Sequence, residues 1–185
     1  MDHRQGQGRL LMKRLVLLLL CALLTTGCVD NAGDPFDDKD EMDVETLQQR
    51  PPMEEVTARY SEMQSKLRDR LSTELGFATD WVDQGDFLRS GCKGTDLPAT
   101  AEQHTLNRWS YQGQISDDRW ARAQQIVAEV AGAYGFGAVE VVLERPGNHS
   151  IVLTDSFGAE LSFASKVHTV LSVRTGCHLL QSAKG

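Results

Sequence analysis

The sequence lacks an apolar run that is long enough to cross a membrane. Its longest run, Leu15 to Leu24, has ten residues. As a helix, these residues would rise about 15 Å, which is half of a hydrocarbon core of roughly 30 Å. A permanent spanning helix in this run is therefore excluded, and the run is typical of a targeting segment.

Residue patterns for metal, phosphate and hydrolytic sites are missing as well. The histidines include no pair spaced one helical turn apart, as zinc ligands on a helix would be, so we interpret His104, His149, His168 and His178 as surface or strand residues. The glycines between positions 132 and 137 follow a predicted helix and are too irregular for a phosphate loop. No serine stands in a G-x-S-x-G elbow. We therefore expect no metal ion and no cofactor.

The N-terminal residues show the three zones of a signal peptide. Four basic residues precede the apolar run, which ends in the small-residue stretch Thr25–Cys28. This ending resembles the bacterial lipobox, in which a diacylglyceryl group is added to the cysteine and the signal is cut just before it. We predict a signal peptide over residues 1–27 and lipidation of Cys28. Thr25 departs from the usual leucine, and Met12 is an alternative start to Met1.

The anchor determines the expected location. Because two or three acyl chains hold a protein at a bilayer lastingly, we expect attachment to the cell membrane on its extracytoplasmic side. The alternative is an ordinary signal peptide that is cleaved elsewhere, with Cys28 left as a free thiol.

Four cysteines occur in the chain, and two of them remain for the folded part. Cys21 lies in the apolar run and Cys28 carries the predicted lipid, which leaves Cys92 and Cys177. Two remaining thiols in an oxidising compartment favour a disulfide. Two separate buried thiols, or a zinc pair without visible further ligands, are the alternatives.

Charge is concentrated at the start of the mature chain. From Cys28 onward there are 158 residues, enough for one domain, with a net charge of −10. Eight acidic residues and one lysine fall between Val29 and Gln49, which predicts a solvated tether over residues 28–50 and a single domain over residues 51–185. The acidic balance argues against nucleic acid as a partner and favours an envelope protein or a neutral molecule.

Two amphipathic helices are predicted in the domain. Apolar residues recur every three or four positions from Val56 to Leu75, after two prolines and before Gly76, which predicts a helix over Met53–Leu75. A second helix is predicted to begin after Ser116 as N-cap and to end at Gly135.

The last third of the chain alternates as strands do. A strand is expected over His104–Gln112, and hairpin strands near residues 139–143, 151–153 and 161–163. Residues 167–173 form either a separate strand or the end of one long bulged strand. These elements predict an α+β fold, a two-layer sandwich with two helices on one face of a four- or five-stranded antiparallel sheet.

The stretch RPPMEEVTARYSEMQSKLRDRLSTELG, followed by Trp81 and Ser90-Gly91-Cys92, resembles the LppA-like lipoproteins of mycobacteria and related actinobacteria. The resemblance covers the lipobox region and about a third of the mature chain. It implies a cell-envelope lipoprotein without an assigned catalytic residue, so that only Cys28 takes a role from the family.

One set of motifs suggests a hydrolase. Ser90 to Lys93 matches S-x-x-K, while residues 116–118 and 174–176 approximate S-D-N and K-T-G of penicillin-recognising enzymes. Because S-x-x-K arises by chance in such a sequence and residues 116–118 are explained as a helix start, a small serine hydrolase is the least favoured hypothesis. A non-catalytic binding domain is favoured, and a lipid or small-molecule carrier is the alternative.

Overall fold

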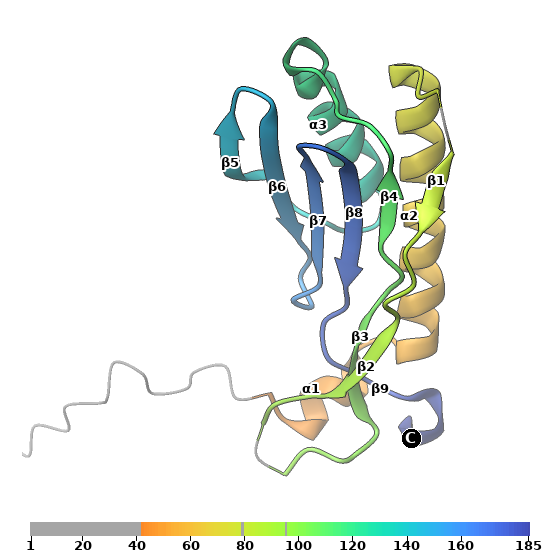
Figure 1. The fold of residues 1–185 in the computed structure, drawn as a ribbon. Helices are drawn as coiled ribbons and strands as arrows, with labels where there is room; N and C mark the ends of the chain where they lie inside the picture. Colours follow the sequence, from red (N-terminus) through yellow and green to blue (C-terminus); the bar gives the residue numbers. More distant parts are fainter. Residues whose placement is uncertain (1–41, 79, 95) are drawn as a thin grey trace, which may run out of the picture. The chain divides into compact units, whose positions relative to one another are not determined.

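The structure, a computed structural model, describes residues 42–78, 80–94 and 96–185 (Figure 1). The predicted signal peptide and Cys28 lie outside these residues. The helices are α1 (Val44–Gln49), α2 (Met53–Leu75), α3 (Asp117–Gly132) and the short 3-10 helix η1 (Gln181–Ala183). The strands are β1 (Trp81–Asp83), β2 (Leu88–Gly91), β3 (Ala101–Thr105), β4 (Trp109–Tyr111), β5 (Glu140–Arg145), β6 (Asn148–Thr154), β7 (Glu160–Ser165), β8 (Thr169–Arg174) and β9 (His178–Leu179).

Helix α2 confirms the first predicted helix, with the predicted bounds. Glu54 and Glu55 lie in its first turn, where carboxylates favour the positive end of the helix dipole. Gly76 ends it in the left-handed conformation, with φ at 55°, which glycine adopts without a steric penalty. All six apolar positions of the predicted stripe are buried.

Helix α3 confirms the second predicted helix, although it ends at Gly132 and not at Gly135. Ser116 is the N-cap residue by backbone position, but its side chain makes no capping hydrogen bond. Trp120 points towards the sheet, where its ring stacks on Phe163 with centroids 5.5 Å apart. This aromatic contact fixes the first turns of α3 on the sheet.

The strands form one antiparallel sheet, and the two long helices cover one of its faces. The central order is β1-β4-β8-β7-β6-β5, while β3 pairs with β2, β8 and β9. Figure 1 shows α2 and α3 side by side on one face of the sheet. The two-layer α+β architecture is therefore as predicted.

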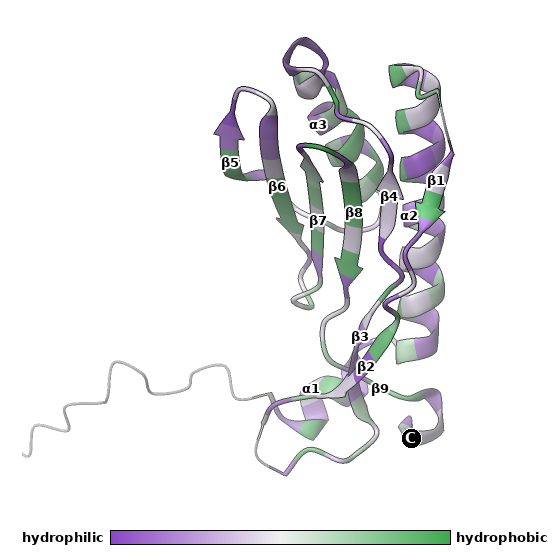
Figure 2. Cartoon of the chain, in the orientation of Figure 1, coloured by the Kyte–Doolittle hydropathy of each residue, from purple (hydrophilic) through white to green (hydrophobic). Residues whose placement is uncertain are grey.

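The core lies between the helices and the sheet. Alternate residues of β6, β7 and β8 are buried, among them Ile151, Phe163 and Leu171 at 0 % exposure. Figure 2 shows hydrophobic residues along these strands. They pack against the buried stripes of α2 and α3 in one cluster. Burial of this apolar surface is the main stabilising term of the fold.

The predicted number of strands was wrong: in the described part of the chain the sheet has nine strands, not four or five. The additional strands are short, and β9 contains two residues. Neither β1 nor β2 has a buried face, so neither produces the alternation by which a strand is recognised.

The single strand predicted over His104–Gln112 is divided into β3 and β4. Thr105 pairs with Arg174 and Trp109 pairs with Leu171. The chain therefore advances four residues from β3 to β4 while β8 opposite it advances only three. One extra residue therefore interrupts the ladder, as in a β-bulge. Residues 160–174 form two strands, β7 and β8, and not one long bulged strand.

The last part of the acidic segment, which was predicted to be a solvated tether as far as Arg50, is folded. Residues 44–49 form α1, and Leu47 is fully buried. One apolar residue in a short acidic segment gives no periodic signal, because the burial comes from contacts with distant parts of the chain. Among residues 42–78, 80–94 and 96–185, no helix is both long and apolar enough to cross a membrane.

Val173 and Val167 allow a matched test of the core. Val173 on β8 is 1 % exposed, whereas Val167 in the turn before β8 is 69 % exposed. We expect Val173→Ala to lower the free energy of unfolding by about 2 kcal/mol, because two buried methyl groups are lost. Val167→Ala should change it by less than about 0.5 kcal/mol in urea denaturation. Equal effects of the two substitutions would contradict this placement of the core.

Candidate functional site: the disulfide-linked junction

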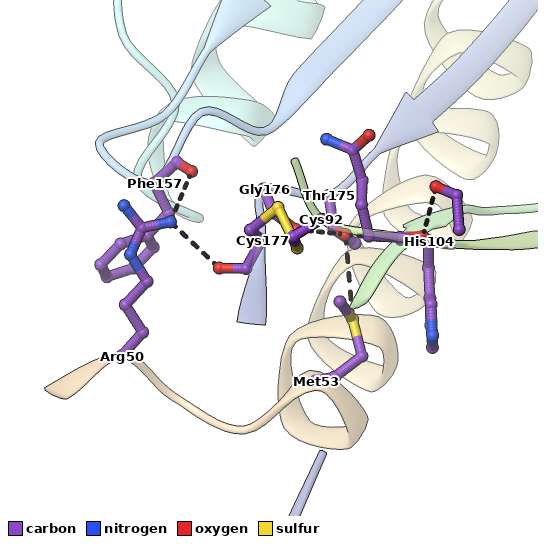
Figure 3. Close-up of a disulfide and its surroundings, with 10 residues drawn as sticks. Arg50, Met53, Cys92, His104, Phe157, Thr175, Gly176 and Cys177 are labelled. Atoms are coloured by element: carbon purple, nitrogen blue, oxygen red, sulfur yellow. Dashed lines mark hydrogen bonds between the residues drawn. A yellow bond between two sulfur atoms is a disulfide. The ribbon is translucent and has the colours of Figure 1, made fainter. Parts of the chain in front are cut away.

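Cys92 and Cys177 form the predicted disulfide, with their Cα atoms 5.9 Å apart. Figure 3 shows the bond in close-up. Cys92 directly follows β2 and Cys177 directly precedes β9. The bond excludes both alternatives, a zinc pair and two separate thiols. In the part of the chain that the structure describes, no three His, Cys, Asp or Glu residues gather as metal ligands would.

The disulfide is part of a small apolar cluster that is separate from the main core. We call it the junction cluster. It consists of Leu47, Ala101 and Leu179, with Met42, Cys92, Leu97, Cys177 and Ala183 packed against it. It therefore joins α1, β3, β9 and the disulfide at one point of the domain.

Helix α1 begins with a side-chain cap. The carboxylate of Asp43 accepts a hydrogen bond of 2.7 Å from the backbone N–H of Thr46. This bond lowers the pKa of the Asp43 carboxyl below its usual value, because it favours the charged form. A helix of six residues is too short to be stable alone, so α1 depends on the contacts that it makes with the domain.

Lys184 holds the other end of α1. Its Nζ donates to the carbonyl oxygens of Leu47 at 3.0 Å and Gln48 at 2.6 Å, and also to that of Arg50. The last carbonyls of a helix lack the partners that a continuing helix would supply, although that of Leu47 also accepts from the Arg50 N–H. The ammonium group bonds to them and complements the negative end of the helix dipole. The final residues of the described chain thereby bind the first helix.

Arg50 links the junction to the turn after β6. Its Nη1 donates to the carbonyl oxygens of Phe157 at 3.1 Å and Cys177 at 3.0 Å (Figure 3). Burial lowers the pKa of the guanidinium, which stays charged at neutral pH. The backbone at Gly176 also lies close to the carbonyl oxygen of Phe157. Only glycine permits this approach, because a Cβ at position 176 would lie 2.0 Å from that oxygen.

His178 is fully buried beside Arg50, so it is a strand residue but not a surface one. Its Nδ1 lies 2.9 Å from the carbonyl oxygen of Pro51, which places the ring proton on Nδ1. Its Nε2 has no hydrogen-bond partner in the described part of the chain. Burial lowers the pKa of His178 below 6.5, because a second proton would place a charge away from water, and the neighbouring guanidinium of Arg50 acts in the same direction.

A separate hydrogen-bond network connects α2 to β3 near the disulfide. The imidazole of His104 lies 3.1 Å from Thr57 Oγ1 through Nδ1 and 2.8 Å from Glu102 Oε2 through Nε2. The backbone N–H of His104 donates to Thr175 Oγ1 at 2.9 Å. Both ring nitrogens are thus engaged, and the arrangement links a helix to the sheet.

The three motifs of the hydrolase hypothesis are not brought together. Ser90 is an exposed residue of β2 whose Oγ donates to the backbone oxygen of Gln103. Residues 116–118 start α3 next to Ser165, which pairs with the first residue of β8, whereas Arg174 is the last residue of β8. S-x-x-K and the other two motifs are therefore separate features of the fold.

Comparison with known proteins places the chain in a family. The sequence model of the LppA family, described as a lipoprotein confined to pathogenic Mycobacterium, matches residues 30–181. The chain belongs to the LppA family. This confirms the resemblance found in the sequence, and no curated protein matches significantly.

Two crystal structures share the LppA-family fold. One is of the lipoprotein LppA from Mycobacterium tuberculosis, with 16 % identity, coverage of 74 % of this chain and 83 % of that chain, and a TM-score of 0.57. The other is of a DUF4853 family protein from Actinomyces odontolyticus, with 17 % identity, coverage of 73 % of each chain and a TM-score of 0.56. At 16 and 17 % sequence identity, the similarity shows a shared fold and carries no conclusion about activity.

Three residues of the junction were missed in the sequence: Arg50, His178 and Lys184. Each binds a backbone oxygen, and the bonds from Arg50 and Lys184 to the partner segment span more than 100 positions. Backbone oxygens carry no residue-specific signal, so the sequence contains no pattern from which these contacts could be found. The cysteines were found because few thiols remained to be paired.

The buried imidazole of His178 makes the stability of the domain dependent on pH. Below about pH 6.5 the unfolded chain binds a proton that the folded chain resists, so the free energy of unfolding is greatest above this pH and falls as the pH is lowered. The slope from this group is at most about 1.4 kcal/mol per pH unit. Asn in place of His178 retains the donor to Pro51 without the titration. We expect His178→Asn to flatten the fall between pH 7.5 and 5.5 in urea denaturation, and an identical slope would contradict this assignment.

Proposed function

We propose that this chain is a membrane-anchored lipoprotein of the cell envelope, with Cys28 as the lipidated residue after removal of residues 1–27. Its membership of a lipoprotein family carries the proposal. The basic residues, the short apolar run and Thr25–Cys28 occur in the order that lipidation requires. The acyl chains attach it to the membrane.

The disulfide supports an extracytoplasmic location. Bonds of this kind persist in oxidising compartments and are rare in the cytosol. Because Cys92 and Cys177 are 85 positions apart, their bond would stabilise the fold by about 4.6 kcal/mol in the chain-entropy model. The domain then lies outside the cytoplasm, on the cell membrane or elsewhere in the envelope.

The domain acts in this proposal as a non-catalytic binding module for another envelope component, with a protein as the favoured partner. The polar groups of the junction bind backbone atoms of their own chain, and thus serve to hold segments together. The acidic charge of the mature chain disfavours nucleic acid.

A carrier of lipid is less well supported. Such a protein needs an apolar cavity, but the space between helices and sheet is filled by fully buried side chains such as Leu67, Ile126 and Phe163. A groove of about 350 Å³ lies between α2 and α3. Charged residues line much of it, including Lys66, Asp69 and Glu129, which suits an acyl chain poorly.

The anchor is tested by replacing the lipidated residue. We expect Cys28→Ala to move the chain from the membrane fraction to the soluble fraction and to abolish incorporation of labelled palmitate. Cys21→Ala is the matched control, because Cys21 lies in the segment that is removed, and it should leave both properties unchanged. Membrane partition and palmitate labelling at wild-type levels in Cys28→Ala would end the proposal.

The absence of hydrolase activity is tested with a fluorophosphonate probe on the full chain. Such probes react with hydroxyl groups that a neighbouring base activates. Ser90 Oγ donates to a backbone oxygen and has no imidazole partner among the described residues. We expect labelling at the level of a Ser90→Ala control, measured by mass spectrometry. Stoichiometric modification of Ser90 or of Thr57 would refute a purely binding role.

A further inference from the structure

The two apolar clusters of the domain divide it into parts that depend on different contacts. The main core contains the stripes of α2 and α3 and the inner residues of β6 to β8. The junction cluster contains Leu47, Ala101 and Leu179 together with the disulfide. A change at the disulfide therefore acts first on the junction cluster.

Helix α1 depends on the C-terminal segment, residues 177–185, for its polar contacts with the rest of the domain. Lys184 binds its last carbonyls, Gln48 Nε2 donates to the Ala183 oxygen at 2.9 Å, and the Gly185 N–H lies 3.3 Å from Gln48 Oε1. If this segment moves away, α1 loses these partners and Leu47 loses the contact with Leu179. Six free residues do not remain helical in water.

The C-terminal segment is itself held to the sheet mainly beside the disulfide. Ala101 pairs with Leu179 and Glu102 with His178, and the Leu180 N–H donates to the Thr100 oxygen at 2.9 Å. This short ladder is closed covalently by Cys92–Cys177. Without the bond, this two-pair ladder, the bond from His178 to Pro51 and a bond of 2.8 Å from the Gln181 N–H to Glu54 Oε2 must hold the segment. A ladder of this length is weak.

Both cysteines are partly exposed, so a thiolate can reach the bond. A dithiol reductant attacks one sulfur with its thiolate, forms a mixed disulfide and releases the other cysteine, which takes up a proton. Its second thiol then attacks the mixed disulfide. The reductant becomes a disulfide, and Cys92 and Cys177 become two thiols.

We propose that the disulfide is a redox-operated clasp that determines whether α1 is docked on the domain or released. Release would leave the main core intact and lengthen the connection to Cys28. The chain between Cys28 and the domain would then extend to Pro52 and not to Met42, which raises its maximal reach from about 48 Å to about 82 Å. This consequence at the membrane depends on the proposed lipid anchor, whereas the clasp itself does not.

Hydrogen exchange of the full chain, with and without dithiothreitol, tests the clasp. We expect the amides of Leu47 and Arg50, which are bonded within α1 and its cap, to exchange at least about tenfold faster after reduction. The amides of β6 to β8 can also exchange faster, because the bond stabilises the whole fold, but they should remain at least about tenfold slower than those of α1. The double variant Cys92→Ser/Cys177→Ser should show the same fast exchange without reductant.

Lys184→Met tests whether the C-terminal segment carries the effect. It keeps the apolar stem and removes the ammonium group, so α1 should exchange faster even with the disulfide intact. Lys66→Met on α2 is the matched control and should leave α1 unchanged, because Lys66 pairs with Glu62 on the same helix.

Two results would overturn the proposal. Exchange of α1 that is unaffected by reduction, or by Lys184→Met, would show that the segment does not hold it. Exchange of β6 to β8 that becomes as fast as that of α1 after reduction would show that the whole domain opens together, without separate release of α1. The same measurement on Cys28→Ala distinguishes the two proposals, because the clasp should open there too.

Discussion

Helix α2 buries its apolar stripe against both α3 and the sheet, and the other elements take their positions from this contact. Hydrogen bonds hold α2 at several points along its length. The side chain of Gln64 donates to the backbone oxygen of Asn107, and the indole of Trp81 donates to Ser72 Oγ. The guanidinium of Arg119, from α3, binds the Leu75 oxygen at its C-terminal end. One long helix thus sets both the register of α3 and the line along which the sheet packs.

The junction adds a second level of organisation to this core. Its disulfide joins the end of β2 to the start of β9, and a set of bonds to backbone oxygens brings the segment before α2 together with β9 and the residues that follow it. Bonds of this kind constrain the path of the chain without creating a reactive group. The contacts of the site hold distant segments of the chain together.

Local patterns made the helices, the α+β class and the pairing of the cysteines predictable from the sequence. The stripe from Val56 to Leu75 has the period of a helix buried on one side, and it needs no knowledge of its neighbours. The strands β1, β2 and β9 were not predictable, because their pairing follows from the position of β3 and β4 and leaves no alternation in their residues. The folding of α1 was missed for the same reason, since its single buried residue, Leu47, is matched by Ala101 and Leu179 far along the chain.

The bonds from Lys184 to α1 join residues that are more than 130 positions apart. During synthesis, the segment that forms α1 emerges long before the lysine that holds it. In the meantime its acidic side chains and Leu47 must remain in solvent. The first helix of the domain consequently gains its C-terminal partners only when the last residues of the chain have been made.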